Sequence, residues 1–238
     1  MKDSLSRSAL LLGESGVDRL VAASVIVFGV GGVGGYAVEA LARAGIGRIG
    51  VVDADVVSES NINRQILATS KTLGKSKVAL AKERILEINP DCKVDAYQLF
   101  YSDESAEKIN LSDYDYVIDA IDTVKSKLLL ITKAKNARTP IISSLGTGNK
   151  LDPTAFKITD IKRTSVCPLA RVMRTELKKL GIEELTVLYS DEPPIKACVS
   201  DGEPGRHAPG SVSFVPSVAG LIIAGHVIKE LSRTNKSQ

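Results

Sequence analysis

The sequence predicts an α/β fold with a doubly wound, mostly parallel sheet, formed as one domain by all 238 residues. Short apolar runs of strand length alternate with stretches of helical periodicity, as in a parallel sheet that helices cover on both faces. The first run also leads into a glycine-rich turn, an amphipathic helix and a second run within about thirty residues, which is the size of a right-handed βαβ unit. Such a sheet binds its ligands beyond the carboxyl ends of the strands.

The chain up to about residue 148 contains five expected strands. Residues 23–28 (ASVIVF) are continuously apolar, as in a strand buried on both faces. The helix after the glycine turn ends at Gly45, because glycine is favoured just past a helix end. The helix over 77–88 ends before Pro90, because a residue that precedes proline avoids the helical region. The other strands are expected over 49–55, 93–100, 115–121 and 140–144, and the other helices near 103–109 and over 123–137.

After Gly148 the alternation becomes less regular. Residues 191–210 are rich in proline, glycine and charge, so we expect a flexible loop there. The C-terminal region, about 149–231, is expected to complete the same domain. Its strands are expected over 155–161, 185–189 and 211–216, and its helices over 168–180 and 217–231.

The composition excludes several classes of protein. The 31 Lys and Arg exceed the 28 Asp and Glu by only three, which does not by itself indicate nucleic-acid binding but is compatible with a local basic face. The apolar runs fall short of the roughly 18 residues of a membrane span, and the N-terminus does not resemble a signal peptide. We therefore expect a cytoplasmic protein with no membrane span. The three cysteines form no CxxC pair, which argues against a structural zinc site.

Three glycines between the first strand and its helix form a G-x-G-x-x-G motif. Gly29 permits the tight turn, Gly31 lets the backbone approach a phosphate, and Gly34 lets the helix pack closely on the strand. Asp53 follows Gly34 by 19 residues, which is the spacing of the acid that binds a ribose. The alternative for Asp53 is a cap on the following turn. Together these residues predict a nucleotide site, and they would suit NAD as well as ATP.

The next stretch distinguishes between these nucleotides. Asn61, Arg64 and Lys77 place an amide and two cations close in sequence to the expected phosphate site. A nucleoside triphosphate needs positive charge there, because charge builds up on the α-phosphate as pyrophosphate leaves. The alternative is that the two cations are ordinary solvated side chains. Lys77 is less easily explained in that way, because a cation at the start of a helix opposes the helix dipole.

Two aspartates, Asp119 and Asp122, stand at the end of a central expected strand. A carboxylate at this edge of the sheet can hold Mg²⁺ against a triphosphate. Asp122 is the stronger candidate, and its alternative role is to cap the helix over 123–137.

In this order, GVGGVGG, DAD, SxxNxxRQI, GKSK and DAID resemble the adenylating E1-like superfamily that includes ThiF, MoeB and HesA. The likeness extends from Arg7 to about Leu231. It implies a Rossmann-like ThiF fold and an enzyme that uses ATP and Mg²⁺ to activate a carboxylate as an acyl-adenylate. It also implies a homodimer in which Arg7 reaches the triphosphate of the neighbouring subunit.

The resemblance also implies roles for individual residues. Asp53 would contact ribose, Asp122 would hold Mg²⁺, and Asn61, Arg64 and Lys77 would contact the phosphates. Residues 1–148 would form the nucleotide-binding core, and residues 149–231 would serve the substrate and the dimer. The expected catalytic residues are Arg7, Arg64, Lys77 and Asp122, and the expected nucleotide-binding residues are Gly29, Gly31, Gly32, Gly34, Asp53, Asp55, Asn61, Arg64, Lys77 and Asp122.

The segment ITDIKRTSVCPLARVMRTELKKLGI is similar to the branch that acts on tRNA, the tRNA threonylcarbamoyladenosine dehydratases (TcdA, or CsdL). The substrate implied is tRNA that carries N6-threonylcarbamoyladenosine (t6A), whose carboxylate is adenylated and then cyclised with net loss of water. The alternative is an activating enzyme for a ubiquitin-like sulfur carrier protein of the ThiS or MoaD type. A third possibility, an NAD-dependent dehydrogenase, is disfavoured by Arg64 and Lys77.

Other candidates are weaker. Cys198 could form a covalent intermediate or receive sulfur from a transfer protein, but Cys167 and Cys198 are more simply incidental, and Cys92 is expected to pack. His226 is expected to pack as well, whereas His207 lies in the expected loop. Basic residues that could contact tRNA, or simply be solvated, are Arg163, Arg171, Arg174, Lys178 and Lys179, and less convincingly Lys125, Lys127, Lys133 and Lys135.

Overall fold

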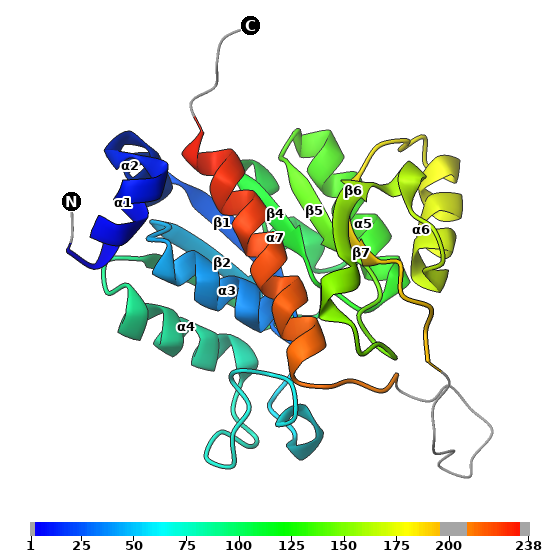
Figure 1. Ribbon diagram of the computed structural model, residues 1–238, viewed down its shortest axis with the longest axis horizontal. Helices are drawn as coiled ribbons and strands as arrows, with labels where there is room; N and C mark the ends of the chain where they lie inside the picture. The colour runs from blue at the N-terminus through cyan, green and yellow to red at the C-terminus, as the bar shows by residue number, and fades with distance from the viewer. Residues whose placement is uncertain (1–2, 196–208, 234–238) are drawn as a thin grey trace, which may run out of the picture.

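The computed structural model describes residues 3–195 and 209–233 and has a seven-stranded sheet at its centre (Figure 1). The strands are β1 (Ser24–Phe28), β2 (Arg48–Val52), β3 (Lys93–Tyr97), β4 (Tyr116–Asp119), β5 (Ile141–Ser144), β6 (Phe156–Asp160) and β7 (Thr186–Ser190). Their order across the sheet is β3-β2-β1-β4-β5-β7-β6. Neighbouring strands are parallel except β6 and β7, which are antiparallel. The expected mostly parallel sheet is confirmed.

Helices cover both faces of this sheet. The α-helices are α1 (Ser6–Leu12), α2 (Glu14–Ala22), α3 (Gly34–Arg43), α4 (Lys77–Ile88), α5 (Val124–Ala137), α6 (Pro168–Lys179) and α7 (Phe214–Ser232). One buried cluster contains side chains of α2, α3, α4 and α7, and the other contains side chains of α5 and α6. The strand order changes direction between β1 and β4, and ligands of doubly wound sheets bind at such a switch point.

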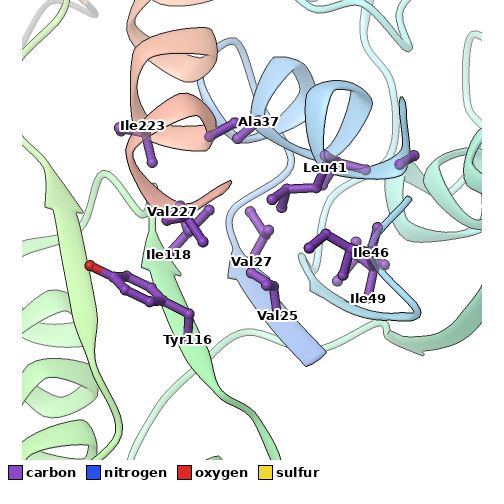
Figure 2. Packing of buried hydrophobic residues seen from close by; sticks show 14 of the residues in the cluster. Val25, Val27, Ala37, Leu41, Ile46, Ile49, Tyr116, Ile118, Ile223 and Val227 are labelled. Carbon is purple, nitrogen blue, oxygen red and sulfur yellow. The ribbon is translucent and has the colours of Figure 1, made fainter. Parts of the chain in front are cut away.

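Strand β1 is apolar from Val25 to Phe28, and the burial of these residues explains why. Val25 and Val27 belong to one buried cluster, and Ile26 and Phe28 belong to the other. Because successive side chains of a strand point to opposite faces, a strand between two helical layers needs an apolar residue at every position. Figure 2 shows the first cluster, in which the β1 valines lie between α3 and α7 and Val227 stands close to them.

Helix α7 packs very closely on α3, and a glycine permits the contact. A Cβ atom on Gly220 would lie 2.2 Å from the Val33 carbonyl oxygen, whereas a Cβ atom on Gly225 of the same helix would meet nothing within 4 Å.

We therefore expect opposite effects from two identical substitutions. Gly220→Ala should lower the free energy of unfolding by about 1–3 kcal/mol through overpacking. Gly225→Ala should raise it by about 0.5–1 kcal/mol, because alanine favours a helix interior. Urea unfolding of both variants and the parent measures this difference. If both substitutions changed the free energy of unfolding equally, the close contact between Gly220 and the Val33 carbonyl oxygen would be contradicted.

Several expected elements are confirmed and others are corrected. The helix over 77–88 is α4, with the same bounds. The strand expected over 211–216 is wrong: Phe214–Pro216 begin α7, because proline is tolerated in the first turn of a helix and the apolar residues continue the buried face of α7. The helix expected near 103–109 is only a short 3-10 turn, Ala106–Lys108. Most of the loop expected over 191–210 lies outside the described residues.

Helix α7 is also long and apolar enough to cross a membrane, with 19 residues and a mean hydropathy of 1.5. In this fold it lies along α3 and α2, and nine of its residues, among them Ile223 and Val227, are buried. Core helices of globular proteins meet the same criteria, and 44% of the 18-residue apolar window of α7 is buried within this protein.

Candidate functional site

A cavity opens at the switch point, beyond the carboxyl ends of β1, β2 and β4. It is lined by nine of the residues that the sequence analysis proposed for the nucleotide site, and these are Gly29, Gly31, Gly32, Asp53, Asp55, Asn61, Arg64, Lys77 and Asp122. Three segments far apart in the sequence therefore converge on one place, as the motifs predicted.

The glycine turn has the geometry that its motif predicted. Gly29 has a φ of 85°, and a Cβ atom there would lie 2.6 Å from the Ala120 carbonyl oxygen. A Cβ atom on Gly34 would lie 1.8 Å from the Gly29 carbonyl oxygen, so Gly34 lets α3 start tightly against β1. By contrast, a Cβ atom on Gly31 would come no closer than 3.7 Å to Gln65 Nε2. The space beside Gly31 is open, as backbone contact with a ligand requires.

Asp53 joins the glycine turn to the end of β2. Its Oδ2 accepts a hydrogen bond from the Val30 N–H at 2.7 Å, and its Oδ1 accepts one from the Asp55 N–H at 2.9 Å. The second bond is the turn cap that the alternative interpretation expected, and the first shows that the carboxylate also braces the glycine turn. Each oxygen retains a lone pair that a ribose hydroxyl could use.

Lys77 is not a solvated surface cation. Its ammonium lies 2.8 Å from Asp55 Oδ2, and only 6% of the Lys77 side chain is exposed against 68% of Asp55. Lys77 is the first residue of α4, after the Ser76 cap, and the helix dipole at this end disfavours a positive charge. A buried cation at the start of a helix, paired with an exposed carboxylate, is well placed to attract an incoming anion.

Asn61 and Arg64 stand on an irregular segment after β2. The buried Asn61 accepts a hydrogen bond from the Ser58 N–H through Oδ1, which orients its amide group. Arg64 Nη1 donates to the Ser60 carbonyl oxygen at 2.7 Å and to Asn63 Oδ1 at 2.9 Å. The local segment thus holds both side chains at the rim of the cavity.

The two aspartates after β4 have different environments. Asp119 is fully buried and pairs with Lys127 at 2.9 Å, so its expected contact with nucleotide or metal is not supported. Lys127 is likewise buried and is not a solvated or tRNA-binding cation. Asp122 is exposed at the cavity. Thr123, rather than Asp122, occupies the cap position of α5, so the capping alternative for Asp122 is wrong.

Arg7 does not line the cavity of its own chain. It is exposed on α1, beside Leu10 and Leu11, whose exposed fractions are 85% and 88%. This is compatible with a role toward another subunit.

The cysteine and histidine candidates that the structure describes are buried or half-buried. Cys92 and Cys167 are buried, and burial raises the pKa of Cys92 to about 11. Half-buried His226 packs edge-on against Tyr116, and burial lowers the pKa of its imidazole, which agrees with a packing role. Cys198 and His207 lie outside the described residues.

Two of the basic residues in and before α6 bind other residues of this chain, and the other three are exposed. Arg174 donates to the carbonyl oxygen of Thr164, and Lys179 pairs with Glu176. Arg163, Arg171 and Lys178 are exposed.

Sequence reasoning did not identify some residues of the cavity. Gln65 and Tyr101 line it, and each carries a buried oxygen atom for which the described residues offer no hydrogen-bond partner. Burial raises the pKa of Tyr101 to about 12. Gln65 lies inside the RQI motif. Phe100 was expected to end a strand over 93–100, but that strand ends at Tyr97, and Tyr101 follows the expected strand directly.

Comparisons with known proteins agree with this geometry. A model of the ThiF family matches residues 5–238. The tRNA threonylcarbamoyladenosine dehydratase of Bacillus subtilis (strain 168) is 46% identical, over 97% of this chain and 95% of that protein. The crystal structure of Escherichia coli TcdA in complex with AMP has a TM-score of 0.88 at 33% identity, over 97% of this chain and 96% of that one. The complex of the same enzyme with ATP has a TM-score of 0.86, over 96% and 93% of the two chains.

A relative with a different named activity matches a smaller part of this chain. The sulfur carrier protein adenylyltransferase of Thermus thermophilus is 38% identical, but only over 55% of this chain and 48% of that protein. The comparisons therefore favour the dehydratase branch over the sulfur-carrier branch.

Proposed function

This chain belongs to the ThiF family, and from that premise we propose that it is an ATP-dependent tRNA threonylcarbamoyladenosine dehydratase. It adenylates the t6A carboxylate in the anticodon loop of tRNA and cyclises the product to cyclic t6A. The observation that carries this proposal is the buried Lys77 ammonium at a cavity formed by a nucleotide-type glycine turn. The full-length similarity to dehydratases from two bacteria supports the choice of substrate.

The residues at the cavity divide the first step between them. Asp53 holds the ribose, so that the triphosphate extends along the glycine turn toward Lys77. A carboxylate oxygen of t6A attacks the α-phosphorus, and the bond to pyrophosphate breaks. Lys77, Arg64 and the Asn61 amide stabilise the negative charge that develops on the phosphates. Electrostatic stabilisation of this kind is usually the largest single contribution to enzyme catalysis.

The second step needs no enzyme thiol. A group within the same modification attacks the activated carbonyl, a ring closes and AMP leaves. Because the nucleophile belongs to the same molecule, its effective concentration is high. The buried positions of Cys92 and Cys167 are consistent with a route that uses neither.

We expect Cys198→Ser to retain most of the dehydratase activity, since the thiol takes no part in either step. Turnover of t6A tRNA by the variant and the parent, measured at equal enzyme concentration, checks this. An inactive but folded variant would support a covalent route through Cys198 instead.

Mg²⁺ fits the available ligands. Mg²⁺ is commonly held by one or two carboxylates together with substrate phosphates, and Asp122 offers an exposed carboxylate at the cavity. The described residues contain no cluster of three or more metal-ligating side chains, so a site shared with the nucleotide is the arrangement they allow. When bound, the ion would supply positive charge to the phosphates of the nucleotide.

The same proposal includes a cytoplasmic homodimer with shared sites. Arg7 is exposed on α1, outside its own cavity, and the exposed Leu10 and Leu11 on the same helix suit a contact with another subunit. Arg7 of one subunit then adds a cation to the triphosphate site of the other. The proposal also includes a sulfur-transfer protein as a further partner.

Incubation with ATP, Mg²⁺ and t6A-containing tRNA, followed by digestion and mass spectrometry, tests the function. The modified nucleoside should lose the mass of one water in an ATP-dependent manner. An unchanged nucleoside, together with ATP–pyrophosphate exchange that depends on a carrier protein with a Gly-Gly terminus, would support the sulfur-carrier alternative.

A further inference from the structure

A buried charged network lies directly beneath the cavity and takes no part in the steps above. The Lys127 ammonium lies 2.9 Å from Asp119 Oδ2 and donates to Ser143 Oγ at 3.2 Å. Ser143 in turn donates to Asp119 Oδ2 at 2.6 Å. Neither charged side chain is exposed at all, so the network joins α5, β4 and β5 inside the protein.

Stability alone is a weak explanation for this network. Moving a carboxylate and an ammonium out of water costs free energy that their attraction offsets only in part, and apolar side chains of similar volume often stabilise a core equally well. Neither Lys127 nor Asp119 lines the cavity, so neither touches a ligand there. A function in positioning other groups accounts for the charges better.

The network holds both ends of the turn that carries Asp122. Asp119 Oδ1 accepts a hydrogen bond from the Ile121 N–H at 3.1 Å. Lys127 lies in the first turn of α5, where its backbone N–H makes the ordinary helical bond to the Thr123 carbonyl oxygen at 3.0 Å, and its ammonium holds Asp119. Lys127 therefore connects the residue before this turn with the residue that starts α5, and Asp122 lies between them.

We propose that Asp119 is a positioning residue: its Oδ1 fixes the turn that presents Asp122 to the metal–nucleotide complex, and Lys127 balances its buried charge. This inference rests on the proposed function in one respect, namely that Asp122 binds Mg²⁺. It predicts that the network controls how strongly Mg²⁺ enhances ATP binding, and that it has little effect on ATP binding without the metal.

Two double variants separate positioning from stability. Asp119→Leu with Lys127→Met removes both charges and also the acceptor for the Ile121 N–H. Asp119→Asn with Lys127→Met removes both charges but keeps an acceptor oxygen for that N–H.

Calorimetry of ATP binding with and without Mg²⁺, together with thermal unfolding, is the measurement. ATP affinity without Mg²⁺ should stay within about threefold of the parent in both double variants, because neither substituted residue itself lines the cavity. The enhancement by Mg²⁺ should fall about tenfold in the Leu/Met variant and recover to within about threefold in the Asn/Met variant. A wild-type Mg²⁺ enhancement in a folded Leu/Met variant would overturn the proposal.

Two further variants complete the design. Ser143→Ala is the variant to use if the Leu/Met variant does not fold. It weakens the network without removing a charge and should reduce the Mg²⁺ enhancement about threefold; no change would overturn the proposal.

The matched control is the ion pair of Glu39 and Arg84, which lies away from the cavity. Glu39→Leu with Arg84→Met should leave the Mg²⁺ enhancement unchanged, and a tenfold loss there would show that the readout is not specific.

Asp122→Asn in the same assay distinguishes the positioning role from the magnesium assignment. If this variant keeps the Mg²⁺ enhancement, the magnesium assignment in the proposed function is wrong and the positioning role falls with it. If it loses the enhancement while the Leu/Met variant keeps it, the magnesium assignment stands and only the positioning role is overturned.

Discussion

Lys77→Met should reduce the rate of adenylation about 100- to 1,000-fold, which is the typical effect of removing one preorganised group that stabilises developing charge. The ammonium is buried at the cavity and held by Asp55 alone among the described residues, so methionine removes the charge and keeps the aliphatic packing. The Asp55 carboxylate left behind is largely exposed, so water can solvate it. We therefore expect the melting temperature to change little.

The measurements are ATP–pyrophosphate exchange with t6A tRNA and the mass of the product nucleoside. Lys75→Met is the matched control, because Lys75 is exposed and lies two residues earlier in the same segment. The control should retain its activity within about threefold, as surface substitutions usually do. Normal turnover by the Lys77 variant would remove that residue from the site.

A heterodimer of two inactive subunits should regain about half of the wild-type activity if Arg7 acts across the dimer. One subunit carries Arg7→Ala and the other carries Lys77→Met. The cavity of the first subunit keeps its Lys77 and receives Arg7 from the second, so one site of the two is intact. If Arg7 served its own cavity, both sites would lack one cation.

Coexpression with two different affinity tags and tandem purification yields this heterodimer without the parental homodimers. Each homodimeric variant, purified with the same tags, is the control and should be nearly inactive. An inactive heterodimer, or an active Arg7→Ala homodimer, would contradict the shared site. We expect an active heterodimer, because Arg7 is exposed and lies outside the cavity of its own subunit.

Much of the fold could be predicted because local patterns and tertiary environment agree. The helix over 77–88 has a serine cap before it and a proline after it, and both ends are where these residues place them. The pattern failed at 211–216, where an apolar run with no helical polar face was interpreted as a strand. Helix α7 is buried on much of its surface, so its sequence lacks the polar stripe that distinguishes a helix.

The site could be predicted to the extent that its residues sit in contiguous motifs. The glycine turn, Asp53 and Lys77 came from short spacings. By contrast, Lys127 was considered as one of a run of surface lysines, since nothing in the run distinguishes the lysine that faces Asp119. Its partner belongs to a neighbouring strand, and only the packing of α5 on that strand brings the two together.

The position of α7 has a consequence for biosynthesis. This last helix covers the β1 valines and packs against α2 and α3, which lie near the beginning of the chain. Arg19 of α2 even donates to the carbonyl oxygen of Ser232, the last residue of α7. Until residues 214–232 are translated, the part of this sheet face that α7 covers stays exposed, although α2, α3 and α4 can already pack on the rest. Contacts of such long sequence separation form slowly, so we expect the apolar surface that α7 covers to stay exposed until synthesis has passed residue 232.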